Sequence, residues 1–231
     1  MADTIITVRG EHSAWYPAER ATASVAVHAN GPKRDTVFAN AVTASEKVRS
    51  LVETLVAASP APVTWWASDS VRVWSERPWS NEGKQLALVY HAAIDFSVKF
   101  GDFDALATWI EAVAAIEFAT IGSISWDLTD ATRKAVTDDV RAAAVADAVA
   151  KATTFANSVG LGAVTVLALA DPGMLGDASR DGGGEMSPAF GGAMKMQAYD
   201  GGGQPVLALK PEEIVVASAV DARFCATKQG A

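Results

Sequence analysis

The chain has little cysteine and little positive charge. Each of these features excludes certain kinds of site or partner. Its one cysteine, Cys225, excludes an intramolecular disulfide and a zinc site built from several cysteine ligands. The 19 lysine and arginine residues stand against 27 aspartate and glutamate residues, which gives a formal net charge of -8 at pH 7. Nucleic acids and anionic membrane surfaces attract clustered positive charge, so we expect neither of them as a partner.

Long hydrophobic runs are absent as well. No run of about 18 or more apolar residues occurs, so the sequence predicts no membrane-spanning helix. The N-terminus has no basic start followed by the apolar stretch of a secretory signal. From these two observations we expect a cytoplasmic protein.

The sequence does contain enough apolar material for a sizeable core, because 50% of its 231 residues are hydrophobic. Apolar residues recur at spacings of three and four where we expect helices, and they alternate where we expect strands. The expected helices span residues 35–58, with Asp35 as N-cap, 103–116 and 132–159. The expected strands span residues 3–10, 20–29, 63–77, 84–100, 121–129, 163–170 and 212–225, with a connection at 12–19.

The strand expected at 84–100 has the clearest period of two, with apolar side chains from Leu86 to Val98 on one face. A strand with one apolar face and one solvent-exposed polar face is typical of an antiparallel sheet that helices cover on its apolar side. The element order ββαββαβαβ-loop-β therefore predicts an α+β fold of antiparallel sheets backed by helices. We expect one domain over residues 1–231 and leave open its construction from two merged units, about 1–118 and 119–231.

Residues 171–205 differ sharply in composition from the rest of the chain. They hold ten of the 18 glycines and four of the five methionines. Such a segment buries too little apolar surface to offset the entropy of ordering, so we expect a flexible loop. None of its glycine runs is followed by Lys-Ser or Lys-Thr, which argues against a phosphate-binding loop.

Catalytic and metal-binding patterns are weak. The three histidines, His12, His28 and His91, are isolated in the sequence, and no pair has the spacing of a metalloprotease motif. His28 and His91 fall on polar strand faces and could be neighbours in a sheet. An enzyme would require these two to converge with a carboxylate within hydrogen-bond reach. We expect no catalytic residue, no metal and no cofactor.

Tryptophan is unusually dense between residues 65 and 79. If the strand expected at 63–77 is regular, Trp66 and Trp74 share a polar face. Large aromatic side chains on such a face indicate a protein interface or a stacking platform for a flat ligand. A bulge at Asp69–Ser70 would instead turn tryptophan toward the core. The candidate interface or ligand-stacking residues are Trp65, Trp66, Trp74 and Trp79.

Four stretches together resemble the SIMPL-domain (DUF541) family. They are IITVRGE at 5–11, ATASVAV at 21–27, the alanine-rich helix from 141 to the Gly-Leu-Gly at 160–162, and PEEIVVASAV at 211–220. The resemblance implies an α+β fold and large ring-like or channel-like homo-oligomers. It implies no catalytic residues. Members of this bacterial family are often periplasmic or envelope-associated and are linked to envelope integrity and oxidative stress.

We therefore predict a non-catalytic, stress-related protein whose main partner is another copy of itself, in a ring, channel-like or cage-like assembly. Strand edges, Trp66, Trp74 and the alanine-rich helix are the expected contacts, and the acidic charge would keep the assembly soluble. The alternative is a module that binds a small or hydrophobic ligand on the tryptophan cluster.

Overall fold

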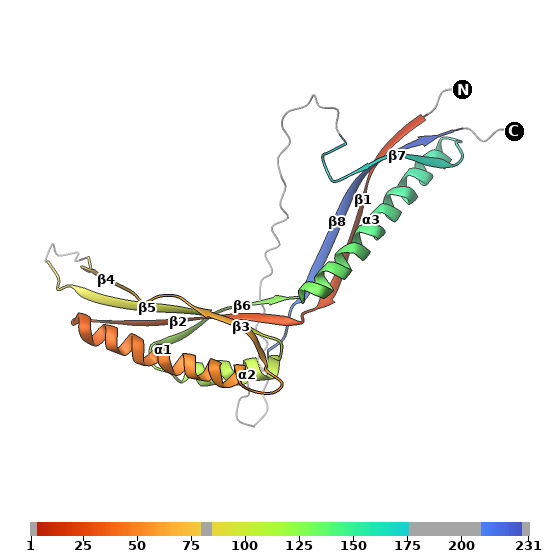
Figure 1. Cartoon of the computed structure of the whole chain (residues 1–231). Coiled ribbons are helices and arrows are strands. Elements are labelled where there is room, and N and C mark those ends of the chain that lie inside the picture. Colours follow the sequence, from red (N-terminus) through yellow and green to blue (C-terminus); the bar gives the residue numbers. More distant parts are fainter. Residues whose placement is uncertain (1–3, 80–84, 176–208, 228–231) are drawn as a thin grey trace, which may run out of the picture. The chain divides into compact units, whose positions relative to one another are not determined.

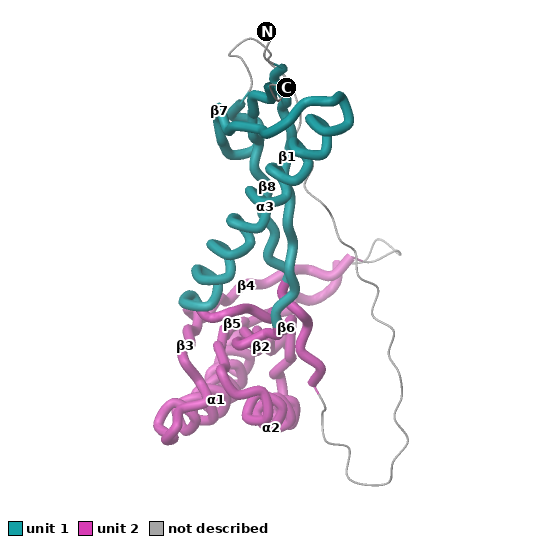
Figure 2. Tube along the Cα trace, turned by 90° about the vertical axis from the view of Figure 1, so that its right-hand side faces the viewer, with its two compact units in different colours: residues 1–16, 130–202, 215–231 teal, residues 17–129, 203–214 magenta. Residues whose placement is uncertain are grey.

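The computed structural model describes residues 4–79, 85–175 and 209–227. The chain divides into two compact units, each made of segments that are far apart in the sequence (Figure 2). Unit 1 comprises residues 1–16, 130–202 and 215–231, and unit 2 comprises residues 17–129 and 203–214. The boundary expected near residues 118 and 119 falls inside unit 2.

Unit 2 is a five-stranded sheet with two helices on one face (Figure 1). The strands lie in the order β3-β5-β2-β6, and β4 also pairs with β5; all of these pairs are antiparallel. The α+β fold with helix-backed antiparallel strands is thus confirmed. The elements are β2 (Arg20–Gly31), α1 (Arg34–Val56), β3 (Val63–Ser68), β4 (Arg72–Glu76), β5 (Val89–Phe100), α2 (Phe103–Ala114) and β6 (Ala119–Asp127).

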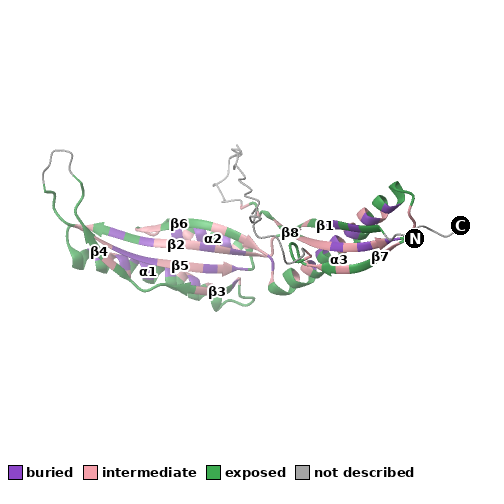
Figure 3. Ribbon diagram, turned by 90° about the horizontal axis from the view of Figure 1, so that it is seen from above, coloured by how far each residue is buried: buried purple, intermediate pink, exposed green. Residues whose placement is uncertain are grey.

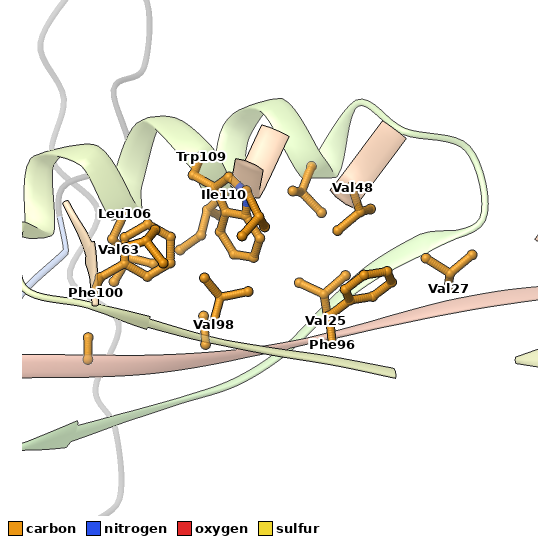
Figure 4. Close-up of a cluster of buried hydrophobic side chains, with 14 of the residues drawn as sticks. Val25, Val27, Val48, Val63, Phe96, Val98, Phe100, Leu106, Trp109 and Ile110 are labelled. Carbon is orange, nitrogen blue, oxygen red and sulfur yellow. The ribbon is translucent and has the colours of Figure 1, made fainter. Parts of the chain in front are cut away.

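The core of unit 2 lies between the sheet and its helices. Burial alternates along β2 and along β5 from Ile94 onward (Figure 3). The buried side chains of these strands pack with those of α1 and α2 in one cluster. The ring of Phe100 lies 5.2 Å from that of Trp109, which comes from α2 (Figure 4). The apolar face predicted along 84–100 is confirmed within β5, whereas Leu86 and Leu88 precede the strand and are exposed.

The helices of unit 2 begin for different reasons. Asp102 is the N-cap of α2, and its carboxylate accepts hydrogen bonds from the N–H groups of Asp104 and Ala105, both at 3.0 Å. The cap expected for the first helix is wrong. Lys33 occupies the N-cap position of α1, and Asp35 lies inside the first turn, where its charge suits the helix dipole.

Unit 1 packs one long helix on a three-stranded sheet with the order β1-β8-β7 (Figure 1). The elements are β1 (Thr4–Pro17), α3 (Asp130–Ser158), β7 (Val164–Ala170) and β8 (Glu213–Ala226). The alanine stripe of α3 faces this sheet, because Ala148, Ala152 and Ala156 are fully buried against its apolar side chains. The stripe therefore builds the core of its own unit, and the expected contact of the alanine-rich helix with another copy stays a prediction for the remaining surface of α3.

The small residues allow a close approach between α3 and β1. A Cβ atom on Gly10 would lie 2.1 Å from the Ala144 backbone oxygen and 2.7 Å from the Ala148 Cβ. Real Cβ atoms do not come so close to other heavy atoms. The spacing of helix and strand therefore depends on the missing side chain at Gly10.

Two expected strands have different bounds in the structure. The first continues to Pro17, through the connection expected at 12–19, because β1 pairs along the 14-residue β8. The strand expected at 63–77 is interrupted after Ser68 and resumes at Arg72, so it forms two strands that both pair with β5.

An ion pair ties β1 to β8 in unit 1. The Arg9 Nε donates to Asp221 Oδ1 at 2.7 Å, and the Gly173 N–H donates to Asp221 Oδ2 at 2.7 Å. The hydrogen bond from Arg9 is the main cause that lowers the pKa of Asp221 below its ordinary value, and it outweighs the opposing effect of partial burial.

This ion pair predicts how the stability of unit 1 depends on pH. Because the pKa of Asp221 is lower in the folded chain, its contribution to the free energy of unfolding is present above the unfolded value of about 3.9. The contribution is lost as the pH falls through the lowered pKa. We expect Asp221→Asn to have a lower urea midpoint than the wild type at about pH 6, and the difference to be smaller at about pH 3, below the unfolded value. A difference of equal size at both pH values would contradict this assignment.

No helix among the described residues is long and apolar enough to cross a membrane. The glycine-rich and methionine-rich loop expected at 171–205 lies outside the described residues from 176 onward.

Candidate functional site

Three aromatic side chains gather on the face of the unit 2 sheet that is opposite to the helices. They are His28 from β2, His91 from β5 and Trp74 from β4. The Trp74 and His91 rings are nearly parallel, with centroids 5.1 Å apart and an interplanar angle of 11°. The centroids of His28 and His91 lie 5.4 Å apart with an angle of 7°. Strand pairing sets this arrangement, since Trp74 pairs directly with His91 and His28 pairs with Ala93.

The two histidines are in direct polar contact, as neighbours in one sheet. The Nδ1 of His91 lies 3.3 Å from the Nε2 of His28, where one nitrogen donates a hydrogen bond to the other. The other nitrogen of His91, Nε2, is buried without a hydrogen-bond partner and lies 3.4 Å from the Glu76 Oε1. The structure thus places a carboxylate beside the pair, but no hydrogen bond joins the Glu76 carboxylate to His91.

Charged groups surround this cluster. Arg72 on β4 forms an ion pair with Asp95 on β5. Farther along β5, the Lys99 ammonium lies 5.8 Å above the ring centroid of Trp65. The outer sheet face of unit 2 therefore combines aromatic surface with charges of both signs.

The four tryptophans proposed as interface or ligand-stacking residues lie in different environments. Trp66 is half-buried and packs against the unit 2 core, which is one of the alternatives that the sequence left open. Trp65, Trp74 and Trp79 are exposed, with exposed fractions of 51%, 42% and 88%. Trp65 and Trp74 lie on the outer sheet face, and Trp79 follows β4.

A shared face for Trp66 and Trp74 was expected only for a regular strand, and the strand is interrupted after Ser68, close to the Asp69–Ser70 bulge that the sequence left open. Trp66 pairs with the buried Val98, whereas Trp74 pairs with the outward-facing His91. Trp74 lies eight residues after Trp66, but its partner His91 lies only seven residues before Val98 along β5. The break after Ser68 therefore shifts the register by one residue. A shift of one residue moves the following side chains to the opposite face.

Unit 1 has an exposed apolar surface that the sequence analysis did not single out. Among the described strands, β7 pairs only with β8, so its other edge is open. Val166, Leu167 and Leu169 of this strand are 47%, 54% and 48% exposed, and we call these three residues the β7 edge. Phe155 and Val159, at the end of α3 and directly after it, are also exposed. The sequence signal is the nearly uninterrupted apolar run of 164–170, which has no polar alternation.

The remaining candidates are isolated. His12 is exposed on β1, and Cys225 is a free, half-buried cysteine on β8. In the described part of the chain, no group of three or more histidine, cysteine, aspartate or glutamate side chains is arranged to hold a metal ion. A cavity of about 330 Å³ between α1 and α2 is lined by apolar and threonine side chains, without a charged group.

The fold and the exposed surfaces define a two-unit α+β protein with an open apolar strand edge. The SIMPL family, described as "Protein of unknown function (DUF541)", matches residues 6–224, and the chain belongs to this family. The comparison with curated proteins finds no match.

The solved structures that are similar include a chain described as "a putative aminohydrolase from methicillin resistant Staphylococcus aureus". It is 14% identical with a TM-score of 0.25, and the likeness covers 55% of this chain and 36% of that chain. The similarity thus spans about a third of that chain's length, and at this TM-score it carries no argument about activity.

Proposed function

We propose that this SIMPL-family protein is non-catalytic and self-assembling, and that its copies associate through the β7 edge. The observation that carries the proposal is the exposure of Val166, Leu167 and Leu169 on an open strand edge. Unpaired strand N–H and C=O groups beside apolar side chains form a template for another strand. Such a surface in contact with water is unfavourable, and association with a second copy removes it from water.

The histidine pair does not change this proposal. His28 and His91 direct a nitrogen at each other, and the Nε2 of His91 is buried. The polar contact that each ring makes is with the other ring, whereas nucleophilic catalysis would require a hydroxyl or thiol in that position. A ring-like or channel-like assembly and a stress-related role remain what the family resemblance implies. A cytoplasmic location stays a prediction that cell fractionation tests.

Light scattering on the full chain during size-exclusion chromatography tests self-assembly. The monomer has a mass of 24.0 kDa. We expect a single kind of particle whose mass is two or more times this value, by a whole number. A particle of 24.0 kDa at every concentration up to the solubility limit would overturn the proposal.

A second candidate function is the binding of a flat aromatic ligand on Trp74. Its indole ring is 42% exposed and already lies parallel to two imidazole rings, so a further ring can extend the stack. We expect such a ligand to change the tryptophan fluorescence of the wild type and to leave that of Trp74→Ala unchanged. Wild-type fluorescence that stays constant across a panel of heteroaromatic compounds would remove this candidate.

A further inference from the structure

We propose that His28 and His91 bind one divalent transition-metal ion, Zn²⁺ or Cu²⁺, on the outer sheet face of unit 2. The site is independent of the β7 edge, and it departs from the expectation that the chain carries no metal. The first observation is the distance of 3.3 Å between the His91 Nδ1 and the His28 Nε2. Two imidazole nitrogens that each lie about 2.0–2.1 Å from one tetrahedral zinc are roughly 3.3 Å apart. The pair therefore has the spacing of two ligands of one ion.

The ligand type selects the class of cation. Imidazole nitrogens suit Zn²⁺, Cu²⁺ and Ni²⁺, whereas Mg²⁺ and Ca²⁺ prefer oxygen ligands. His28 is exposed, so water can complete the coordination shell. With two protein ligands, the site accepts an ion from solution and leaves part of the shell open.

Glu76 supplies the group that a metal-binding histidine usually needs on its other nitrogen. The buried Nε2 of His91 has no hydrogen-bond partner and lies 3.4 Å from the Glu76 Oε1. A ligating histidine commonly donates its second N–H to a carboxylate, which fixes the tautomer and the ring orientation. When His91 carries its proton on Nε2, toward Glu76, its Nδ1 lone pair is free for the ion. In this tautomer the Nε2 proton faces the Glu76 carboxylate, and a small movement of the exposed Glu76 side chain would complete the hydrogen bond.

The ring of His91 is held in place before any ion binds. The side chain of His91 is only 12% exposed, and the Trp74 ring stacks on it at 5.1 Å. A preorganised ligand loses little conformational entropy on binding, which favours affinity. Without metal, one proton occupies the contact between the two nitrogens. On binding, that proton moves to the other nitrogen of its ring through solvent, and both contact nitrogens present lone pairs.

Calorimetric titration of the full chain with ZnCl₂, and electron paramagnetic resonance with CuCl₂, test the site. We expect one ion per chain and a Cu²⁺ spectrum with two nitrogen ligands. His28→Gln and His91→Gln are each expected to weaken binding by about tenfold or more, and Glu76→Gln by about tenfold, since it removes the carboxylate beside the ligand. Bound Cu²⁺ should also quench a fluorescence component that Trp74→Phe lacks, because Trp74 stacks on His91.

His12→Gln is the matched control, because it removes the one other histidine, which lies on β1 of unit 1. This variant should bind both ions as the wild type does, and MgCl₂ should give no binding heat. The proposal would be overturned if the wild type bound neither Zn²⁺ nor Cu²⁺ in a saturable way. Wild-type affinity in His28→Gln, a variant of an exposed residue that should fold normally, would overturn it as well. These outcomes do not depend on self-assembly, which light scattering tests separately.

Discussion

Gly10→Ala is expected to lower the free energy of unfolding of unit 1 by about 3 kcal/mol or more. The added Cβ would lie 2.1 Å from the Ala144 backbone oxygen and 2.7 Å from the Ala148 backbone nitrogen and Cβ. None of these atoms is the end of a flexible side chain, so the clash is relieved only if α3 moves away from β1. Such a movement would expose the alanine stripe that forms the core of unit 1. Urea unfolding followed by circular dichroism measures the loss.

Gly101→Ala is the matched control in unit 2. A Cβ at Gly101 would lie 3.6 Å from the Thr64 Cγ2, which is an ordinary contact, and its backbone is not in the left-handed region. We expect its free energy of unfolding to stay within about 1 kcal/mol of the wild type. Equal effects of the two substitutions would show that the close approach at Gly10 is not what limits the packing of α3 on β1.

Leu167→Lys combined with Leu169→Lys is expected to convert the assembly to the 24.0 kDa monomer. Both side chains are about half exposed, so the charges remain in water within one copy and the fold should be retained. Between two copies, the same lysines would be buried without partners or would face each other, and either arrangement is strongly unfavourable. The masses of the particles from light scattering and the circular dichroism spectra measure the two effects separately.

Phe38→Lys combined with Val71→Lys is the control for this variant. Both residues are exposed apolar side chains of unit 2, and the change in net charge is the same. We expect this variant to assemble as the wild type does. If it dissociates while the Leu167→Lys, Leu169→Lys variant stays assembled, the contacts between copies lie in unit 2 and the β7 edge is not the interface.

Regular periodicity made most of the fold predictable. The apolar positions of β5 and of α1 recur at the spacings of a strand and a helix, and most of the residues expected to face inward are buried, although Leu51 and Leu55 of α1 are only partly buried. The helix and strand inferences use residues that are close together in the sequence, where local pattern and burial agree. The polar strand faces of His28 and His91 allowed these residues to be neighbours in a sheet, but their contact joins two strands that are far apart in the sequence.

The sequence left the structure open or misplaced an element where pairing between distant segments determines the fold. The extension of β1 to Pro17 depends on pairing with β8, which lies about 200 residues later in the sequence. The opposite faces of Trp66 and Trp74 depend on a shift of one residue within the pairing to β5. The packing of the alanine stripe depends on Gly10, in a strand far from α3 in sequence. No local pattern in the sequence contains these relations.

Amide hydrogen exchange in β7 tests the central claim most directly. Residues 164–170 form an open strand edge within one copy, and we propose that this edge pairs with another copy. In the full chain, the outward N–H groups of β7 should exchange slowly at high protein concentration. They should exchange faster on dilution and in the Leu167→Lys, Leu169→Lys variant. Fast exchange of these groups that is the same at every concentration would contradict association through the β7 edge.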